Sequence, residues 1–300
     1  SAPALGAGGP RFESWYPDIQ KGFNVKVKSL LLYISSLTIP EKDDTPPYIL
    51  LRQQPQLDLM KIIIMGATSG IGRAVAEIYL RNGHQVGVCG RRTERLEEIK
   101  NKFPDNSHIA TVDVNSNESI SAFSRLIEEM GGMDLYIHCS GYGRQTENLD
   151  ADTEMQTAAT NVMGFTRFVG SAYRYFVANS RHGHIAFISS IAGTKGLGAS
   201  PSYSASKRYQ WIYAEALEQM ARMRGHHIRL TDIRPGFVDT DFLGHGHYPL
   251  MLDVESVARS IVHAIATSKR VAVIDWRYRL LCFFWRMIPT SVWVRMPVHS

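Results

Sequence analysis

The sequence is poor in cysteine and has no long apolar run. Its three cysteines, Cys89, Cys139 and Cys282, lie far apart in apolar or motif surroundings. Without paired spacing they do not form a disulfide framework, so we expect a reducing compartment, the cytoplasm. The apolar runs at residues 29–37 and 280–285 are too short to span a bilayer, and the first starts too deep for an ordinary signal peptide.

Other signals are missing as well. The net charge is +5, but the body of the chain lacks the Lys/Arg run with interleaved aromatics that is typical of nucleic-acid binding. The histidine pairs His182/His184, His226/His227 and His245/His247 have neither cysteine nor spaced acids beside them, so we expect no metal site. Internal repeats are absent from residue 61 onward. These absences favour a globular protein that acts on a small molecule.

The chain divides into three parts by composition. Residues 1–59 are rich in Gly, Ala, Pro and Gln, and we expect a poorly ordered or appended extension, with Met60 as a natural start. Residues 60–275 contain the regular pattern of a single globular domain. Residues 276–300 form a tail that is both apolar and basic.

Strand and helix patterns alternate through the central part. Apolar strand patterns occur at residues 62–65, 85–89, 108–112, 134–138, 184–189, 227–233 and 271–274. Helical patterns occur at residues 73–81, 93–103, 118–130, 153–179, from Tyr203 to about 224, and 254–268. Short, fully apolar strands separated by helices predict an α/β fold with a doubly wound, Rossmann-type parallel sheet.

A glycine-rich turn follows the first strand. Gly66, Gly70 and Gly72 stand between that strand and the next helix, where glycines let the backbone approach a pyrophosphate at a helix N-terminus. An NAD site usually places a carboxylate after the second strand, but this chain has Arg91 and Arg92. Two guanidinium groups suit the 2′-phosphate of NADP. The alternative is a pair of solvated arginines that open a helix.

A tyrosine and a lysine stand four residues apart in a predicted helix. Tyr203 and Lys207 therefore share one helical face, where an ammonium group can favour the deprotonated phenol. Such a pair would make a proton donor of a group that is inert at neutral pH. Taken alone, the spacing is also common on solvated helix faces.

With these features the sequence resembles the short-chain dehydrogenase/reductase family of classical type, over residues 61–271. Ser190 precedes Tyr203 by 13 residues, the usual interval of the family. Asn161 matches the helix asparagine, and Asp113-Val114, Pro235-Gly236 and Thr240 match further family positions in order. The residues around the predicted fourth strand depart from the pattern: His138-Cys139-Ser140-Gly141 replaces Asn-Asn-Ala-Gly, which removes two asparagines that support the strand. Met65 stands where threonine is common.

The resemblance implies the role of each matched residue. Tyr203 is the general acid/base, Ser190 positions the substrate oxygen, Lys207 lowers the tyrosine pKa together with the oxidised nicotinamide, and Asn161 holds a water in a proton relay. The implied catalytic residues are thus Asn161, Ser190, Tyr203 and Lys207. The implied cofactor contacts are Gly66, Thr68, Ser69, Gly70, Ile71, Gly72, Arg91, Arg92, Asp113, Val114, Ser140, Gly141, Tyr203, Lys207, Pro235, Gly236, Val238 and Thr240.

The tail and the segment before the last predicted helix bear on the substrate. Tryptophans flanked by arginines in residues 276–296 fit a helix at a membrane interface or a cap over an apolar substrate; the alternative is packing on the core or on a second subunit. Such extensions resemble those of lipid-handling members of the family, including 3-ketosphinganine reductases. His245, His247 and Tyr248 stand where the family closes a lid over its substrate.

We therefore expect an NADP(H)-preferring oxidoreductase that interconverts a hydrophobic ketone, such as a 3-keto lipid, and a secondary alcohol. We expect a cytoplasmic homodimer or homotetramer with a peripheral membrane contact through the tail. A 3-oxoacyl-thioester reductase, whose basic tail would meet an acidic carrier, is one alternative. A regulatory protein that senses NADPH without turnover is another, although such a binder has no need of the Ser190, Tyr203, Lys207 and Asn161 set.

Overall fold

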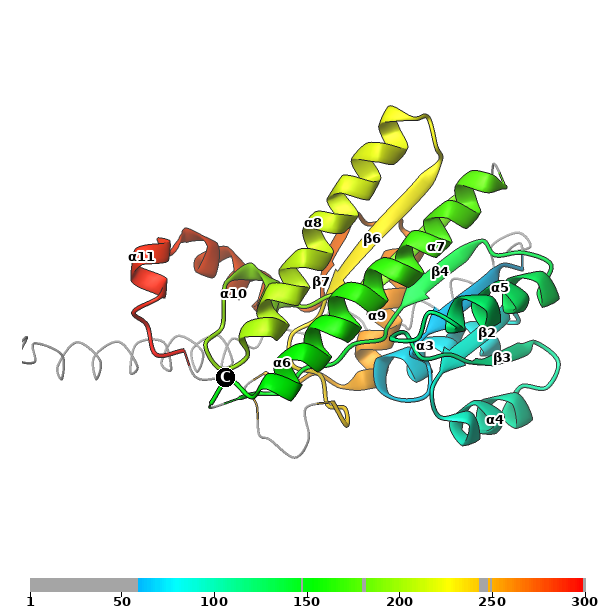
Figure 1. Ribbon diagram of the computed structural model, residues 1–300, viewed down its shortest axis with the longest axis horizontal. Coiled ribbons are helices and arrows are strands. Elements are labelled where there is room, and N and C mark those ends of the chain that lie inside the picture. Colours follow the sequence, from blue (N-terminus) through cyan, green and yellow to red (C-terminus); the bar gives the residue numbers. More distant parts are fainter. Residues whose placement is uncertain (1–58, 147, 180–181, 243–247, 249, 299–300) are drawn as a thin grey trace, which may run out of the picture. The chain divides into compact units, whose positions relative to one another are not determined.

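The structure is a computed structural model that describes residues 59–298 except 147, 180–181, 243–247 and 249 (Figure 1). Contacts divide the chain into a larger unit, residues 42–288 with 298–300, and a smaller one, residues 1–41 with Pro289–Pro297. The expected N-terminal extension lies outside the described residues apart from Leu59. Likewise, His245 and His247 of the expected lid are outside them.

The larger unit contains one sheet of seven parallel strands, in the order β3-β2-β1-β4-β5-β6-β7. The strands are β1 (Lys61–Met65), β2 (Gln85–Gly90), β3 (Ser107–Thr111), β4 (Leu135–His138), β5 (Gly183–Ile188), β6 (Ile228–Arg234) and β7 (Val271–Val273). Each predicted strand is present within two residues of its predicted ends. The order reverses between β1 and β4, and in open parallel sheets ligands bind outside the carboxyl ends of strands at such a point.

The connecting helices also follow the prediction, with one exception. They are α3 (Gly70–Arg81), α4 (Thr93–Lys102), α5 (Ser119–Glu129), α8 (Pro201–Met223) and α9 (Val254–Ala266). The predicted helix over residues 153–179 is instead α6 (Ala151–Ala158), a π-helical turn η1 (Ala159–Gly164) and α7 (Phe165–Ala178). A π-helical turn contains an extra residue, which periodicity at 3.6 does not reveal, and such turns are frequent at functional sites.

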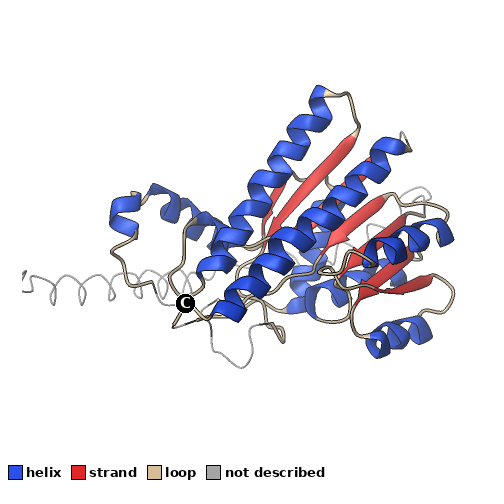
Figure 2. Cartoon of the chain, viewed as in Figure 1, coloured by secondary structure: helices blue, strands red, loops and turns tan. Residues whose placement is uncertain are grey.

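Helices cover the two faces of the sheet (Figures 1 and 2), and an apolar cluster lies on each face. Alternate residues of β1 point to opposite sides: Ile62 and Ile64 pack with α3, α4 and α9, whereas Ile63 and Met65 pack with α5, α7 and α8. Because both faces are covered, β1 is apolar from Ile62 to Met65 rather than alternating. Polar side chains are therefore left mainly at the strand ends, where the site lies.

The tail contains two helices. Helix α10 (Trp276–Met287) packs Tyr278 and Cys282 against Ile191 of the short 3₁₀-helix η2 (Ile191–Thr194). Helix α11 (Thr290–Trp293) belongs to the smaller unit. No described helix is long and apolar enough to cross a membrane.

Candidate active site

The turn after β1 is shaped for close backbone approach. Gly66 and Gly70 have positive φ angles of 86° and 53°. A Cβ on Gly66 would lie 2.6 Å from the Ser140 nitrogen, and one on Gly72 would lie 2.2 Å from the Gly66 carbonyl oxygen. Helix α3 starts here, and its N-cap Ser69 makes no side-chain capping hydrogen bond. The turn and the N–H groups of the first helical turn therefore fit the pyrophosphate of a dinucleotide.

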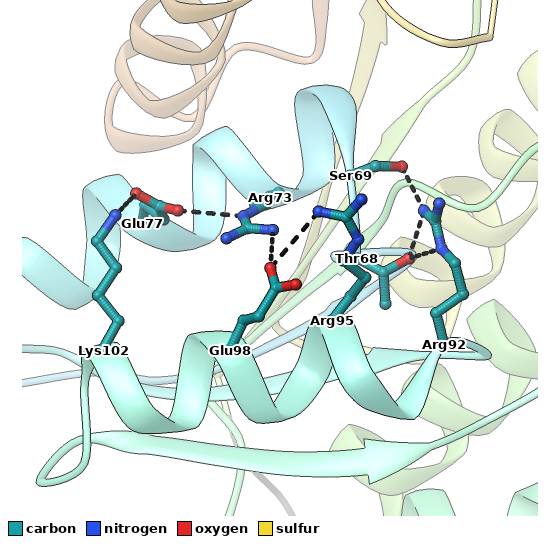
Figure 3. Close-up of polar contacts among 8 residues, drawn as sticks. All are labelled: Thr68, Ser69, Arg73, Glu77, Arg92, Arg95, Glu98 and Lys102. Carbon is teal, nitrogen blue, oxygen red and sulfur yellow. Dashed lines mark hydrogen bonds and ion pairs between the residues drawn. The ribbon is translucent and has the colours of Figure 1, made fainter.

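Arg92, one of the two arginines predicted to bind the 2′-phosphate, reaches this turn (Figure 3). Its guanidinium donates to Thr68 Oγ1 at 2.9 Å and to Ser69 Oγ at 2.6 Å. Gly90, at the end of β2, leaves room for Thr68, because a Cβ there would lie 2.5 Å from the Thr68 methyl group. Arg91 is exposed. Of the two arginines, Arg92 is the one placed against the glycine turn.

An ion-pair network joins α3 to α4, the helix that Arg92 precedes (Figure 3). Arg73 contacts Glu98 at 2.8 Å, and Lys102 contacts Glu77 at 2.7 Å. Surface pairs contribute little to stability, typically about 0–1 kcal/mol each. Their effect here is geometric, since they keep α4 beside the turn.

Tyr203 and Lys207 share one face of α8, as the spacing predicts. The Lys207 ammonium lies 5.6 Å from the centre of the Tyr203 ring. Burial raises the pKa of Tyr203 to about 12, and a hydrogen bond with Ser190 opposes this rise. The cost of burying the phenolate outweighs this hydrogen bond. The lowering expected from Lys207 together with the oxidised nicotinamide stays a prediction.

Lys207 is a buried cation held by two acceptors. Its Nζ donates to the Ile188 carbonyl at 3.0 Å and to Gln210 Oε1 at 3.3 Å. Burial lowers the Lys207 pKa to about 8, and the charge of Asp232 opposes that shift. The ammonium thus sits at the end of β5, where it is fixed from the strand side.

Ser190 follows β5 and caps η2, accepting a hydrogen bond from the Ala192 N–H at 3.1 Å. The residue before it is also fixed: Ser189 Oγ accepts from Trp211 Nε1 at 3.0 Å and donates to Asp232. Asp232 in turn forms a buried ion pair with Arg234. Burial raises the Asp232 pKa, while Arg234 acts in the opposite direction. This network leaves Ser190 little freedom to move.

Asn161 lies in η1 and is fully buried. Its amide donates to the Tyr142 carbonyl at 2.6 Å and to Ser206 Oγ at 3.0 Å, and its Oδ1 accepts from the Tyr142 N–H at 2.8 Å. Its backbone carbonyl accepts from Gln210 Nε2 at 3.0 Å. Gln210 therefore links Asn161 to Lys207, and Gln210 was not among the predicted site residues. The available signal was a glutamine three positions after Lys207, on the same helix face.

The segment after β6 borders the phenol of Tyr203. Phe242 lies 5.9 Å from Tyr203, ring centre to ring centre, and Phe237 stacks on Tyr248 at 4.6 Å. A Cβ on Gly143 would lie 2.3 Å from the Tyr203 ring. The ring of Tyr203 therefore contacts both the chain after β4 and the chain after β6.

Helix α10 holds both ends of that second segment through one hydroxyl group. Tyr278 Oη accepts from the Phe237 N–H at 3.1 Å and donates to the Leu250 carbonyl at 3.0 Å. Gly236 has no side chain where the Tyr278 ring packs, since a Cβ there would lie 2.1 Å from it. Val238 and Leu252 form a parallel bridge at the same place. Nothing in the sequence analysis assigned Tyr278 this contact.

The remaining predicted contacts lie along the carboxyl edge of the sheet. Thr240 packs its methyl group 3.2 Å from the Cβ position of Gly70, and Val114 packs against Gly164 of η1. The Pro235 carbonyl accepts from the Ile191 N–H at 3.1 Å. Asp113 accepts from the Asn115 N–H through its carboxylate at 3.0 Å. Ser140 adjoins Gly66, and Gly141 adjoins Asn161 and Lys207.

His138 fills the place of a family asparagine at the end of β4. It is buried, and its Nδ1 bonds the Tyr136 hydroxyl at 2.8 Å. Its Nε2 has no hydrogen-bond partner among the described residues. Burial lowers the His138 pKa to about 3, and the nearby Lys207 charge adds to this. The histidine is therefore neutral, and the predicted loss of the asparagine hydrogen bonds is met in part by Tyr136.

The chain is similar to known oxidoreductases over most of its length. Residues 60–246 match the family described as short chain dehydrogenase. Farnesol dehydrogenase of Aedes aegypti is 31% identical over 226 residues, covering 70% of this chain and 91% of that protein. The NADP-dependent 3-hydroxy acid dehydrogenase YdfG of Escherichia coli O6:H1 is 30% identical over 186 residues, covering 60% and 73%.

Solved structures agree with the fold. Serine dehydrogenase from Escherichia coli is 25% identical, with a TM-score of 0.62 over 72% of this chain and 97% of that one. The closed form of serine dehydrogenase complexed with NADP+ is 24% identical, with a TM-score of 0.63 over 72% and 94%.

Proposed function

The chain belongs to the short chain dehydrogenase family, as an NAD(P)-dependent oxidoreductase acting on CH–OH and C=O groups, and from this premise we propose that it interconverts a hydrophobic ketone and a secondary alcohol with NADP(H). The proposal is supported chiefly by one observation: Ser190 and Lys207 both adjoin the half-buried phenol of Tyr203. The chemistry that a bound nicotinamide supplies is hydride transfer to or from the carbon.

The protein's own groups handle the proton and the oxygen. During reduction, Tyr203 gives its phenolic proton to the carbonyl oxygen; during oxidation, it takes the proton of the alcohol. Ser190 donates a hydrogen bond to the same oxygen and stabilises its developing charge. Lys207 carries positive charge below its pKa of about 8 and offsets the phenolate that forms after proton release.

Asn161 is connected to Lys207 by the hydrogen bonds of Gln210. Gln210 accepts from the ammonium and donates to the Asn161 carbonyl, so it keeps the lysine at the tyrosine and fixes η1. We assign Gln210 a positioning role. The sequence-based expectation of a water held by Asn161 stays a prediction, and in the structure both hydrogens of the Asn161 amide are used by Tyr142 and Ser206.

The preference for NADP(H) rests on charge. Arg92 presents a guanidinium beside the glycine turn, and no acid stands at the end of β2 to bind a free ribose 2′-hydroxyl. A 2′-phosphate would be held by charge-assisted hydrogen bonds. Solved NADP complexes of relatives with this fold are consistent with that cofactor.

The substrate class rests on the lining of the site. Phe242 puts an aromatic ring 5.9 Å from that of Tyr203, and Phe237 and Tyr248 stack on each other in the same segment after β6. Relatives act on farnesol and on 3-hydroxy acids by name, and both are compatible with an apolar chain beside a secondary or primary alcohol carbon. A free 3-keto lipid, as for 3-ketosphinganine reductases, is our leading substrate. A 3-oxoacyl thioester on an acidic carrier is the second candidate, favoured by the basic tail.

The experiment is a panel of ketones and alcohols followed at the NADPH absorbance, with NADH in parallel. We expect turnover of apolar ketones with NADPH and loss of turnover in Tyr203→Phe, whose NADPH binding, measured by fluorescence, stays near the wild-type value. Near-normal turnover by Tyr203→Phe contradicts the catalytic assignment. A wild-type protein that binds NADPH but turns over none of the panel favours a regulatory sensor.

We also propose a cytoplasmic homodimer or homotetramer. The three cysteines are free, in agreement with a reducing compartment. A groove along α7 and α8 is lined by Gly170, Tyr173, Tyr213, Leu217 and Met220, which suits a second copy. Light scattering after chromatography tests it: a monomer at micromolar concentration contradicts the proposal.

A further inference from the structure

Helix α10 has a buried face and an exposed apolar face. Tyr278 and Cys282 are 1% and 4% exposed and pack on η2. Leu280, Phe283, Phe284 and Met287 are instead 39%, 58%, 44% and 66% exposed. At 3.6 residues per turn these four side chains fall within an arc of about 100°, the width of a continuous apolar stripe. We call this stripe the outer face of α10.

Positive charge flanks the outer face. Arg279 and Arg286 lie on one side of it, are exposed, and make no ion pair among the described residues. Arg277 lies on the other side and pairs with Asp275, the N-cap. Helix α10 itself contains no acidic residue. Apolar side chains bordered by unpaired arginines are typical of a helix that lies in a membrane interface.

Charge also decides among the surfaces that could cover the outer face. A second copy packed on this face would add the same arginines and no acidic residue of α10, so the like charges oppose a dimer through this face. An anionic lipid surface presents phosphates to those arginines and an acyl boundary to the phenylalanines. The other strongly exposed apolar side chains of the larger unit, such as Met155 on α6 and Met223 on α8, lie on segments other than α10.

We propose that the outer face of α10 docks on an anionic lipid surface, with Phe283 and Phe284 at the acyl boundary and Arg279 and Arg286 at the phosphates. This goes beyond the proposed redox function and depends only on α10. The docked helix is the one whose buried face holds Phe237 and Leu250 through Tyr278. A lipid-bound enzyme would therefore present the segment beside Tyr203 near the surface from which an apolar substrate arrives.

The test is flotation of the full-length protein with vesicles, without cofactor or substrate, so that its result is separate from any result on turnover. Vesicles of phosphatidylcholine are compared with vesicles of phosphatidylcholine and phosphatidylglycerol. We expect binding to the mixed vesicles, weaker binding to the neutral ones, and a decrease with added salt, because exposed charges are screened.

Two double variants separate the apolar and the charged contributions. Phe283→Ser/Phe284→Ser is expected to weaken binding at least about tenfold, since each phenylalanine loses burial. Arg279→Glu/Arg286→Glu is expected to weaken binding to the anionic vesicles at least about 25-fold, at about fivefold per arginine. Met155→Ser/Met223→Ser, which removes two side chains that are 71% and 79% exposed, is the matched control and should bind like the wild type.

Circular dichroism and thermal unfolding check that each variant is folded. Absence of wild-type binding to mixed vesicles overturns the proposal, as does unchanged binding by both outer-face variants. A concentration-dependent dimer that Phe283→Ser/Phe284→Ser dissolves, without lipid binding by the wild type, also overturns it and assigns the face to a second copy.

Discussion

The two sides of the site are held by different means. On the cofactor side, between β1, β2 and β4, backbone segments touch directly because glycines remove the side chains that would separate them, as Gly66 does against Ser140. On the substrate side, segments distant in sequence are joined by side-chain hydrogen bonds from α10. Tyr278 reaches Phe237 across 41 residues and Leu250 across 28.

This difference has a consequence for sequence and for tolerance to mutation. Backbone contact requires glycine at fixed spacing, so the cofactor side leaves a visible motif and has no substitute for those residues. Side-chain contact can be made by any residue of suitable length from any element, so the substrate side leaves no motif. We therefore expect graded effects on the substrate side and all-or-none effects on the cofactor side.

The largest effect is expected from Gly66→Ala. Its Cβ would lie 2.6 Å from the backbone nitrogen of Ser140, at a φ of 86° that strains any side chain. We expect loss of measurable NADPH binding by fluorescence titration and a lower unfolding temperature. Gly198→Ala, where a Cβ meets nothing within 4 Å, is the control and should behave like the wild type. Normal NADPH binding by Gly66→Ala would contradict the view that the cofactor side depends on its glycines.

Arg92→Leu should act on one cofactor only. Removing a charge-assisted contact worth about 1.5–3 kcal/mol should raise the KM for NADPH roughly tenfold to 100-fold and leave the KM for NADH nearly unchanged. Arg95→Leu, one helical turn along α4 and paired with Glu98 at 3.5 Å, is the control. An equal rise for both cofactors would show that Arg92 supports the turn rather than the phosphate.

Tyr278→Phe should have an intermediate effect confined to the substrate side. The ring still packs on Gly236, but both hydrogen bonds to the segment ends are lost, so we expect a several-fold higher KM for ketones with NADPH affinity unchanged. Tyr175→Phe is the control, because the Tyr175 hydroxyl also accepts a backbone N–H, that of Met133, at 3.1 Å. We expect Tyr175→Phe to lose a similar amount of stability, with no change in its KM for ketones. An NADPH affinity of Tyr278→Phe that differs from that of the wild type would contradict the separation of the two sides.

His138→Asn should change the pH dependence of stability. The pKa of His138 is about 3 in the folded protein, below the ordinary 6.5. As the pH falls below 6.5, His138 therefore binds a proton in the unfolded chain but not in the folded protein, and stability decreases. Between pH 6.5 and 5 this costs the wild type about 2 kcal/mol of unfolding free energy. Urea unfolding should show this loss in the wild type and a smaller one in His138→Asn; parallel curves for the two proteins would refute it.

The sheet and the cofactor side could be predicted because their physics is local. Ile62 to Met65 is apolar without interruption since both faces of β1 are covered, and the Gly66 turn follows at once. The spacing of Tyr203 and Lys207 likewise fixes their shared face. These inferences need only the neighbours of a residue along the chain.

The features that could not be predicted depend on contacts between segments that are distant in the sequence. Nothing near Tyr278 indicates that its hydroxyl lies between Phe237 and Leu250, and the π-helical turn that carries Asn161 has the same composition as an ordinary helix. The raised pKa of Tyr203 was also not predictable, because it depends on how completely the phenol is buried. Burial is a property of the whole fold.

The paired contacts of Asn161 with Tyr142 have a further consequence. One amide group bonds both the N–H and the carbonyl of a single residue, as an adjacent strand would. The side chain therefore takes the place of a neighbouring strand for the chain that leaves β4. Gly143, the next residue, lies against the Tyr203 ring, so this one amide group fixes the backbone beside the phenol.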